Sequence, residues 1–353
     1  MEDGNIKLVF FKDINLNDVF FDSLREDYDG FNDWFNKKAQ NNKRAFVYYD
    51  DENKLCDFLY LKIENEALLD IEPKLPPAKR LKVGTFKIDS RGSKRGERFI
   101  KKIMDVAMFE KIEQIYVTIF EKQESLIRIF KRYGFYKCGT KGSSDIKESV
   151  YIKDLKDEKG DIYLDYPKIN RIGNKKYLLS IRPEFHSKMF PDSILNNENP
   201  NKLVSDIPYT NSINKVYISN IKDTKSLKRG DIVTIYRTKF NGSAWYTAVA
   251  STICVVSKIT DVSDYSSFED FYIDVNNISI FDKNTLKKKY KEGKFVVIKM
   301  LYNVAFTKRI IRKDLIEKVN LDSENYWGFF ELTDEQFEEI YKLGEVNESY
   351  FIN

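Results

Sequence analysis

The chain has few of the residues that build metal sites and disulfide frameworks. Its 353 residues include only three cysteines and one histidine. Cys56, Cys138 and Cys254 show no paired spacing, and His186 stands alone, so we expect neither a metal site nor a disulfide-stapled fold. This cysteine usage is typical of a reducing compartment, and the protein is therefore expected in the cytoplasm.

Long apolar runs are also lacking. No stretch of about 18 apolar residues occurs, and no basic and apolar leader accompanies the acidic residues Glu2 and Asp3. We therefore expect no membrane partner and no secretion signal. The chain is instead 42% hydrophobic and 14% aromatic, which is too rich for a disordered polypeptide. Its length predicts two packed domains.

The charges are unevenly distributed although the net charge is only +4. Residues 74–102 contain eleven basic residues and two acidic ones, and residues 283–318 form a second basic region. Two separate basic regions indicate two contacts with anions, whereas a single charged run is more often a solvated face.

The first part of the chain, residues 1–155, alternates short apolar runs with helical patterns, as α/β domains do. Strands are expected at residues 6–11, 44–49, 55–63, 81–88, 115–120 and 135–138, and helices at 31–40, 99–108 and 124–133. Residues 156–162 are polar and are expected to be a linker. A mixed central sheet flanked by helices follows from this pattern.

The second part, residues 163–353, is rich in β-type runs. Strands are expected at residues 177–181, 215–218, 231–236, 246–258 and 295–302, separated by turn signals, and helices at 310–317 and 334–343. Short strands in this arrangement predict a mostly-β barrel.

One loop in the first domain has the design of a phosphate site. A strand that ends in a basic, glycine-containing loop and then opens a helix offers free N–H groups and a helix dipole to an anion. The segment Arg91-Gly92-Ser93-Lys94-Arg95-Gly96 has this design. It matches neither the nucleotide triphosphate loop nor the dinucleotide fingerprint. Taken alone, such a connection is more often only structural.

Together with the elements around it, this segment resembles the pyrophosphate loop of the GNAT acetyltransferase superfamily, whose form is Arg/Gln-x-x-Gly-x-Gly/Ala. Arg91 and Gly96 match the first and last positions, Lys94 replaces the middle glycine, and Gly134-Phe135 matches a second family segment. The resemblance covers residues 1–155 and implies acetyl-coenzyme A as cofactor. It places the following residues beside the coenzyme: Phe86, Ile88, Arg91, Gly92, Ser93, Lys94, Arg95, Gly96 and Phe130.

The resemblance leaves the acid and the base of the reaction open. Many members carry a tyrosine four residues before the Gly-Phe pair, which protonates the departing thiolate. Phe130 occupies that position here, so Tyr133, Tyr136 or solvent would have to act instead. Asp70 and Glu72 are the expected carboxylate bases, and Asp89 is a third. Each of these carboxylates also fits an ordinary surface role.

In the second domain, the turn Arg229-Gly230-Asp231 before a strand is similar to that of PUA-like domains of the ASCH and EVE kind, which contact RNA or a modified base. The resemblance implies a nucleic-acid surface, which we assign to Arg182, His186, Lys188, Arg229 and Arg237. A lone histidine such as His186 is more often structural than a ligand.

The preferred hypothesis is an acetyl-coenzyme A-dependent N-acetyltransferase that the second domain directs to RNA or to an RNA-bound amine such as a charged tRNA. One alternative is a nucleic-acid-binding protein with a weak acetyltransferase half. Another is an acetyltransferase that acts on a protein lysine or a small amine. A protein partner or an oligomer stays open.

Overall fold

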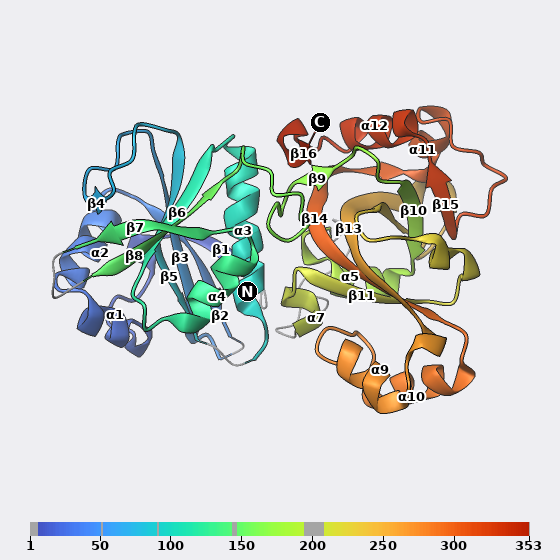
Figure 1. The fold of residues 1–353 in the computed structure, drawn as a ribbon, viewed down its shortest axis with the longest axis horizontal. Coiled ribbons are helices and arrows are strands. Elements are labelled where there is room, and N and C mark those ends of the chain that lie inside the picture. The colour runs from blue at the N-terminus through green and yellow to red at the C-terminus, as the bar shows by residue number, and fades with distance from the viewer. Residues whose placement is uncertain (1–5, 51, 90–91, 143–146, 194–207, 353) are drawn as a thin grey trace. The chain divides into compact units, whose positions relative to one another are not determined.

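The computed structural model describes residues 6–50, 52–89, 92–142, 147–193 and 208–352 (Figure 1). These residues divide into two compact units, one that ends at Glu158 and one that begins at Lys159. We call them unit 1 and unit 2. In the described ranges, no helix is long and apolar enough to cross a membrane.

Unit 1 is built on an eight-stranded mixed sheet in the order β1-β2-β3-β5-β6-β8-β7-β4. Its strands are β1 (Lys7–Phe10), β2 (Arg44–Tyr49), β3 (Leu55–Glu64), β4 (Ile71–Glu72), β5 (Arg80–Ile88), β6 (Gln114–Ile119), β7 (Tyr136–Lys141) and β8 (Glu148–Asp154). Among the described pairs only β5 and β6 run parallel. The mixed sheet expected from the sequence is confirmed.

Helices cover both faces of this sheet (Figure 1). They are α1 (Asp22–Asp27), α2 (Phe31–Gln40), α3 (Arg95–Phe109) and α4 (Glu124–Arg132). The apolar side of α3 packs on the sheet because Phe99, Ile103 and Ala107 recur at helical spacing and are fully buried. In α2, Phe31 and Phe35 join an aromatic core with residues of β2 and β3. The helices expected at 31–40, 99–108 and 124–133 are thus confirmed.

One central strand, β8, has no counterpart among the expected strands. Its residues from Ser149 to Lys153 are all buried, the polar ones included. Because both faces of this strand are covered, it lacks the alternation of apolar and polar residues that marks a half-exposed strand.

Unit 2 contains a six-stranded sheet in the order β11-β14-β13-β12-β10-β15 and a separate pair, β16-β9. The strands are β9 (Ile169–Asn170), β10 (Lys176–Ile181), β11 (Asn214–Ser219), β12 (Ile232–Arg237), β13 (Val249–Asp261), β14 (Val296–Ile311), β15 (Phe329–Leu332) and β16 (Phe351–Ile352). The helices are α5 (Pro183–Met189), α7 (Pro208–Asn211), α8 (Ala244–Thr247), α9 (Phe268–Val275), α10 (Lys283–Glu292), α11 (Arg312–Glu317) and α12 (Asp334–Leu343).

The expected closed barrel is not what the described residues form. Strands β11 and β15 are the two edges of the sheet, and in the described ranges no pairing joins them. The sheet is mixed, since β10 and β12 run parallel. The helix expected at 310–317 begins only at Arg312, because the long strand β14 continues to Ile311 and pairs there with β13.

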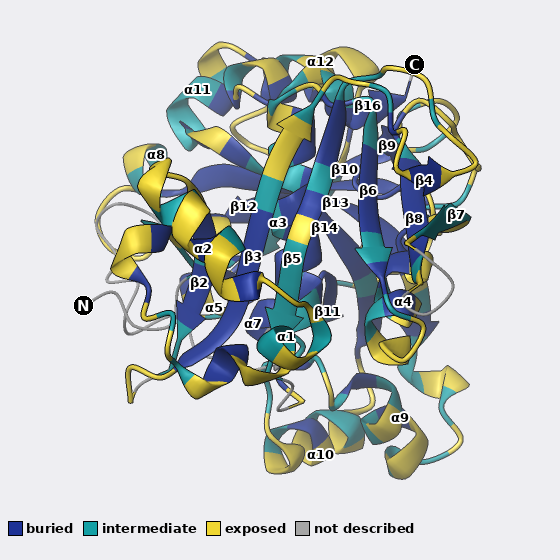
Figure 2. Cartoon of the chain, turned by 90° about the vertical axis from the view of Figure 1, so that its left-hand side faces the viewer, coloured by how far each residue is buried: buried dark blue, intermediate teal, exposed yellow. Residues whose placement is uncertain are grey.

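Burial separates the structural residues from the solvated ones (Figure 2). The central strands β12 and β13 of unit 2 are largely buried, whereas much of α10 is exposed. Leu286 is the buried residue of α10, and Lys283, Lys287 and Lys288 face solvent. This part of the second basic region is therefore a solvated helix face.

Candidate functional site

The sheet of unit 1 opens between its two parallel strands. β5 and β6 pair only from Arg80 to Val83 and from Gln114 to Val117. Beyond that point β5 continues to pair with β3, and β6 with β8. In the described residues, the edge of β5 that faces β6 therefore has no strand partner after Val83. Its backbone N–H and C=O groups are available to a ligand.

A β-bulge lies at the point where the strands separate. Val83 pairs with Leu61 and Thr85 with Tyr60, so Gly84 is the extra residue. A Cβ atom on Gly84 would lie 2.8 Å from Cδ1 of Tyr60. Only glycine allows this close approach, and the bulge re-aims the residues that follow it.

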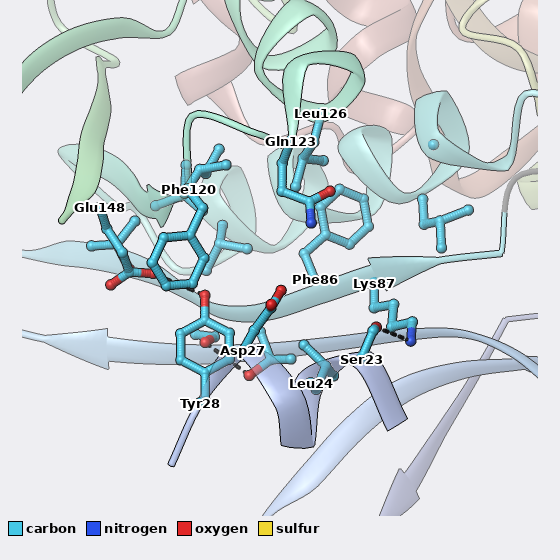
Figure 3. Close-up of a pocket in the computed structure, with 18 of the residues that line it drawn as sticks. Ser23, Leu24, Asp27, Tyr28, Phe86, Lys87, Phe120, Gln123, Leu126 and Glu148 are labelled. Carbon is cyan, nitrogen blue, oxygen red and sulfur yellow. Dashed lines mark hydrogen bonds between the residues drawn. The ribbon is translucent and has the colours of Figure 1, made fainter. Parts of the chain in front are cut away.

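A cavity of about 760 Å³ occupies this opening. Its size falls in the range of small-molecule sites. The walls come from β5 and β6, from α1 and the start of α2, and from the N-termini of α3 and α4. Figure 3 shows Phe86 of β5 and Gln123 and Leu126 near α4 on one side, with Tyr28 and Leu24 on the other.

One end of the cavity is suited to an anion. Gly92, Ser93 and Lys94 line it directly before α3. Gly92 and Lys94 have φ values of 77° and 59°, so the loop turns sharply into the helix. The dipole of a helix favours negative charge at its N-terminus. Arg91 lies outside the described residues.

Arg95 and Gly96 also line the cavity, but their contacts are with the protein. The Arg95 guanidinium lies 2.6 Å from the Asp57 carboxylate, with side chains that are 3% and 0% exposed. It also donates to the backbone oxygen of Asp89 at 2.6 Å. A Cβ on Gly96 would lie 3.2 Å from Cδ1 of Ile129, so this glycine lets α3 and α4 approach. Both residues hold the loop in place.

Of the other residues expected beside the coenzyme, Phe86 and Ile88 line the cavity and Phe130 does not. Phe130 is fully buried and packs against Phe86 and Phe135, with ring centroids 5.9 and 4.8 Å apart. It therefore supports Phe86 from behind. Helical packing, the ordinary role of a phenylalanine at this position, is what the structure shows.

The residues expected to act as acid and base are not brought to the cavity, with the exception of Asp89. Tyr133 is fully buried, and the exposed Tyr136 does not line the cavity either. Asp70 is paired with Lys141 at 2.6 Å, a contact that lowers the pKa of its carboxyl, and Glu72 is exposed on β4. Glu72 lies on β4 and Asp70 directly before it, and β4 pairs with β7 at the edge of the sheet.

Two residues that the sequence did not single out meet in the cavity. The Tyr28 hydroxyl donates to Glu148 Oε1 at 2.9 Å, and its ring lies against Phe120 with centroids 5.2 Å apart (Figure 3). Burial and the Glu148 carboxylate raise the pKa of Tyr28, which therefore keeps its proton. The two residues lie 120 positions apart, so no local pattern could have joined them.

The residues assigned to nucleic-acid contact lie in unit 2 in different environments. Arg182 and Lys188 are exposed, and Arg229 is paired with Asp161 at 2.8 Å. His186 and Arg237 are buried. His186 Nε2 lies 2.7 Å from Ser251 Oγ, and burial, with Arg237 and Arg309 nearby, lowers the pKa of His186 to about 3. His186 is a neutral core residue.

No protein-family model matches the chain, and no curated protein does. Solved structures give two kinds of similarity. ASCH from Zymomonas mobilis is 12% identical, with a TM-score of 0.32, over 48% of this chain and 95% of that one. A GNAT-family acetyltransferase from Streptococcus agalactiae is 18% identical, with a TM-score of 0.30, over 40% and 81% of the two chains.

A third similar structure is a nourseothricin acetyltransferase, 20% identical with a TM-score of 0.25 over 31% of this chain and 62% of that one. Both resemblances expected from the sequence are thus found, and the first two structures each cover roughly half of the chain. All three TM-scores are below 0.5, so these similarities carry no conclusion about activity.

Proposed function

We propose that unit 1 is an N-acetyltransferase that binds acetyl-coenzyme A in the cavity between β5 and β6. The observation that carries this proposal is the separation of two parallel strands beside the N-terminus of a helix. The unpaired edge of β5 suits the amide-rich arm of the coenzyme, which needs backbone partners. The loop Gly92-Ser93-Lys94 and the first turn of α3 suit its pyrophosphate.

Bound there, acetyl-coenzyme A supplies an activated acetyl thioester. The acceptor amine must lose a proton when its nitrogen forms the new C–N bond and the C–S bond breaks. Glu148 is the carboxylate we assign to take that proton, directly or through a water. Tyr28 orients Glu148 through its 2.9 Å hydrogen bond. The thiolate takes a proton from solvent and leaves as free coenzyme A, and the hydroxyl of Ser125, which lines the cavity, can donate a hydrogen bond to the sulfur.

Calorimetric titration with acetyl-coenzyme A, beside the unacylated coenzyme, tests this function. Lys94→Glu places a negative charge in the loop and is expected to abolish binding. Lys102→Glu, on α3 but outside the cavity, is the matched control and is expected to bind as the natural protein does. The proposal fails if the natural protein binds neither form of the coenzyme at millimolar concentration.

Unit 2 has a second candidate function, contact with the bases of an RNA. It is favoured by an aromatic and basic surface: Tyr246 and Tyr326 are 61% and 67% exposed, and Arg312 lies over the Trp327 ring at 4.4 Å. Exposed rings beside a guanidinium are typical of base-stacking surfaces. Anisotropy with labelled single-stranded RNA should show salt-sensitive binding that weakens in Tyr326→Ala. Equal affinity in that variant would contradict this candidate.

A further inference from the structure

Lys82 of β5 lines the cavity, and its ammonium group has no acceptor in the part of the chain that the structure describes. It is half-buried, and its Nζ lies over the Tyr116 ring at 5.6 Å from the centroid. Among the described residues it makes no ion pair and no hydrogen bond through its side chain. An ammonium has three donors, and a partly buried one that lacks acceptors is costly.

The carboxylates nearest Lys82 are already engaged. Glu64 accepts from Lys62 Nζ at 2.7 Å and from the Tyr116 hydroxyl. Asp70 accepts from Lys141 Nζ at 2.6 Å. Burial lowers the pKa of Lys82; the positive charge of Lys141 adds to that effect, Glu64 and Asp70 oppose it, and Lys62 adds to it again. Among these described residues the lysines outnumber the carboxylates, so the positive charge around Lys82 is not fully balanced.

The anion that would satisfy Lys82 cannot be the pyrophosphate of the coenzyme. Lys82 lies six residues before Ile88, the last residue of β5, which leads into the loop before α3. At ~3.3 Å per residue this is a separation of roughly 20 Å along the strand. Lys82 also precedes the bulge at Gly84, so it lies on the acceptor side of the point where the strands separate.

We propose that Lys82 binds a carboxylate or phosphate group of the acceptor, so that the preferred acceptor is an amine that also carries an anion. This inference rests on the function proposed above. The aromatic rings of Trp34, Tyr28 and Phe120 line the same cavity and suit an apolar or aromatic part of the same acceptor. Lys82 is thus a specificity residue for the acceptor.

Matched acceptor pairs test this inference, with thiol release from acetyl-coenzyme A as the assay. The pairs are tyramine and tyrosine, tryptamine and tryptophan, and ethanolamine and phosphoethanolamine. A hydrogen bond to a charged group contributes about 1.5–3 kcal/mol, so the anionic member should have a kcat/KM roughly 10- to 100-fold higher. The first two pairs report a carboxylate preference and the third a phosphate preference.

Variants then assign the preference to Lys82. Lys82→Met is expected to bring the ratio within each pair close to one, and Lys82→Arg, which keeps the cation, to retain most of it. Lys102→Met is the matched control, because Lys102 is a lysine of the same unit, on α3, that lies outside the cavity. It should leave every ratio unchanged. Thermal unfolding of each variant shows whether it is folded.

The outcomes separate the two proposals. If the coenzyme does not bind, the acetyltransferase function itself fails. If it binds and the ratios are near one in the natural protein, or no member of any pair is acetylated, the Lys82 inference alone is overturned. Peptide mass mapping tests whether Lys82 itself becomes acetylated. An acetyl group on Lys82 would make this lysine an acceptor and overturn its role as an anion site.

Discussion

The buried ion pair of Arg95 and Asp57 is expected to hold the loop before α3, and removal of either partner should destabilise unit 1. Arg95→Met leaves the Asp57 carboxylate buried at 0% side-chain exposure and 2.6 Å from where its partner was. Breaking a buried pair in this way costs about 3–5 kcal/mol. Asp57→Leu leaves the guanidinium uncompensated and should cost a similar amount.

The double variant Arg95→Met with Asp57→Leu is expected to recover most of that loss, because replacing a whole buried pair by apolar side chains is often neutral or stabilising. The coupling energy of this double-mutant cycle should therefore be about 3 kcal/mol or more. For a domain of 150–250 residues, 1 kcal/mol shifts the Tm by roughly 2–4 °C. Each single variant should lower the Tm of unit 1 by roughly 6–20 °C in calorimetry.

Coenzyme titration adds a second readout. Arg95 also donates to the backbone oxygen of Asp89, a contact that methionine cannot make. The double variant should therefore be stable and yet bind acetyl-coenzyme A more weakly than the natural protein. Additive single losses, or single losses below about 0.5 kcal/mol, would refute the view that this pair is a coupled buried interaction.

Three further variants test other parts of the structure. Gly84→Ala should lower the free energy of unfolding of unit 1 by about 1–3 kcal/mol and reduce turnover, because the new Cβ would lie 2.8 Å from the Tyr60 ring. A variant as stable as the natural protein would contradict this close approach. Phe130→Tyr buries a hydroxyl at about 1–3 kcal/mol and should not raise turnover; a clear rise in kcat would show that the hydroxyl reaches the cavity. Burial lowers the pKa of His186 from about 6.5 in the unfolded chain to about 3 in the folded protein. Between these two values only the unfolded state binds a proton at this residue. The free energy of unfolding therefore decreases as the pH falls below 6.5, by up to about 1.4 kcal/mol per pH unit. Denaturant titrations across this range should show a shallower pH slope in His186→Leu, and an unchanged slope would exclude His186 as the cause.

Local sequence patterns were sufficient for one side of the candidate site. The helical spacing of Phe99, Ile103 and Ala107 predicted α3, and the basic, glycine-containing segment before it predicted an anion site at its N-terminus. Both predictions depend on residues within one or two turns of each other. The role of Arg95 was not predictable in the same way, because Asp57, which neutralises it, lies on another strand.

The sequence by itself predicted an α/β part and a β-rich part, most of the strands, the helices α2, α3, α4 and α12, and a loop that lines one end of the cavity. These features follow from periodicity and turn chemistry, which act over a few residues. Only the tertiary structure decided which side chains share the cavity. Glu148 reaches Tyr28, and Lys82 has no acceptor among the described residues, because of strand order and register, which bring together residues far apart in the chain. The tertiary structure also determines that the six-stranded sheet of unit 2 is open, because no local sequence pattern specifies whether the two edge strands pair.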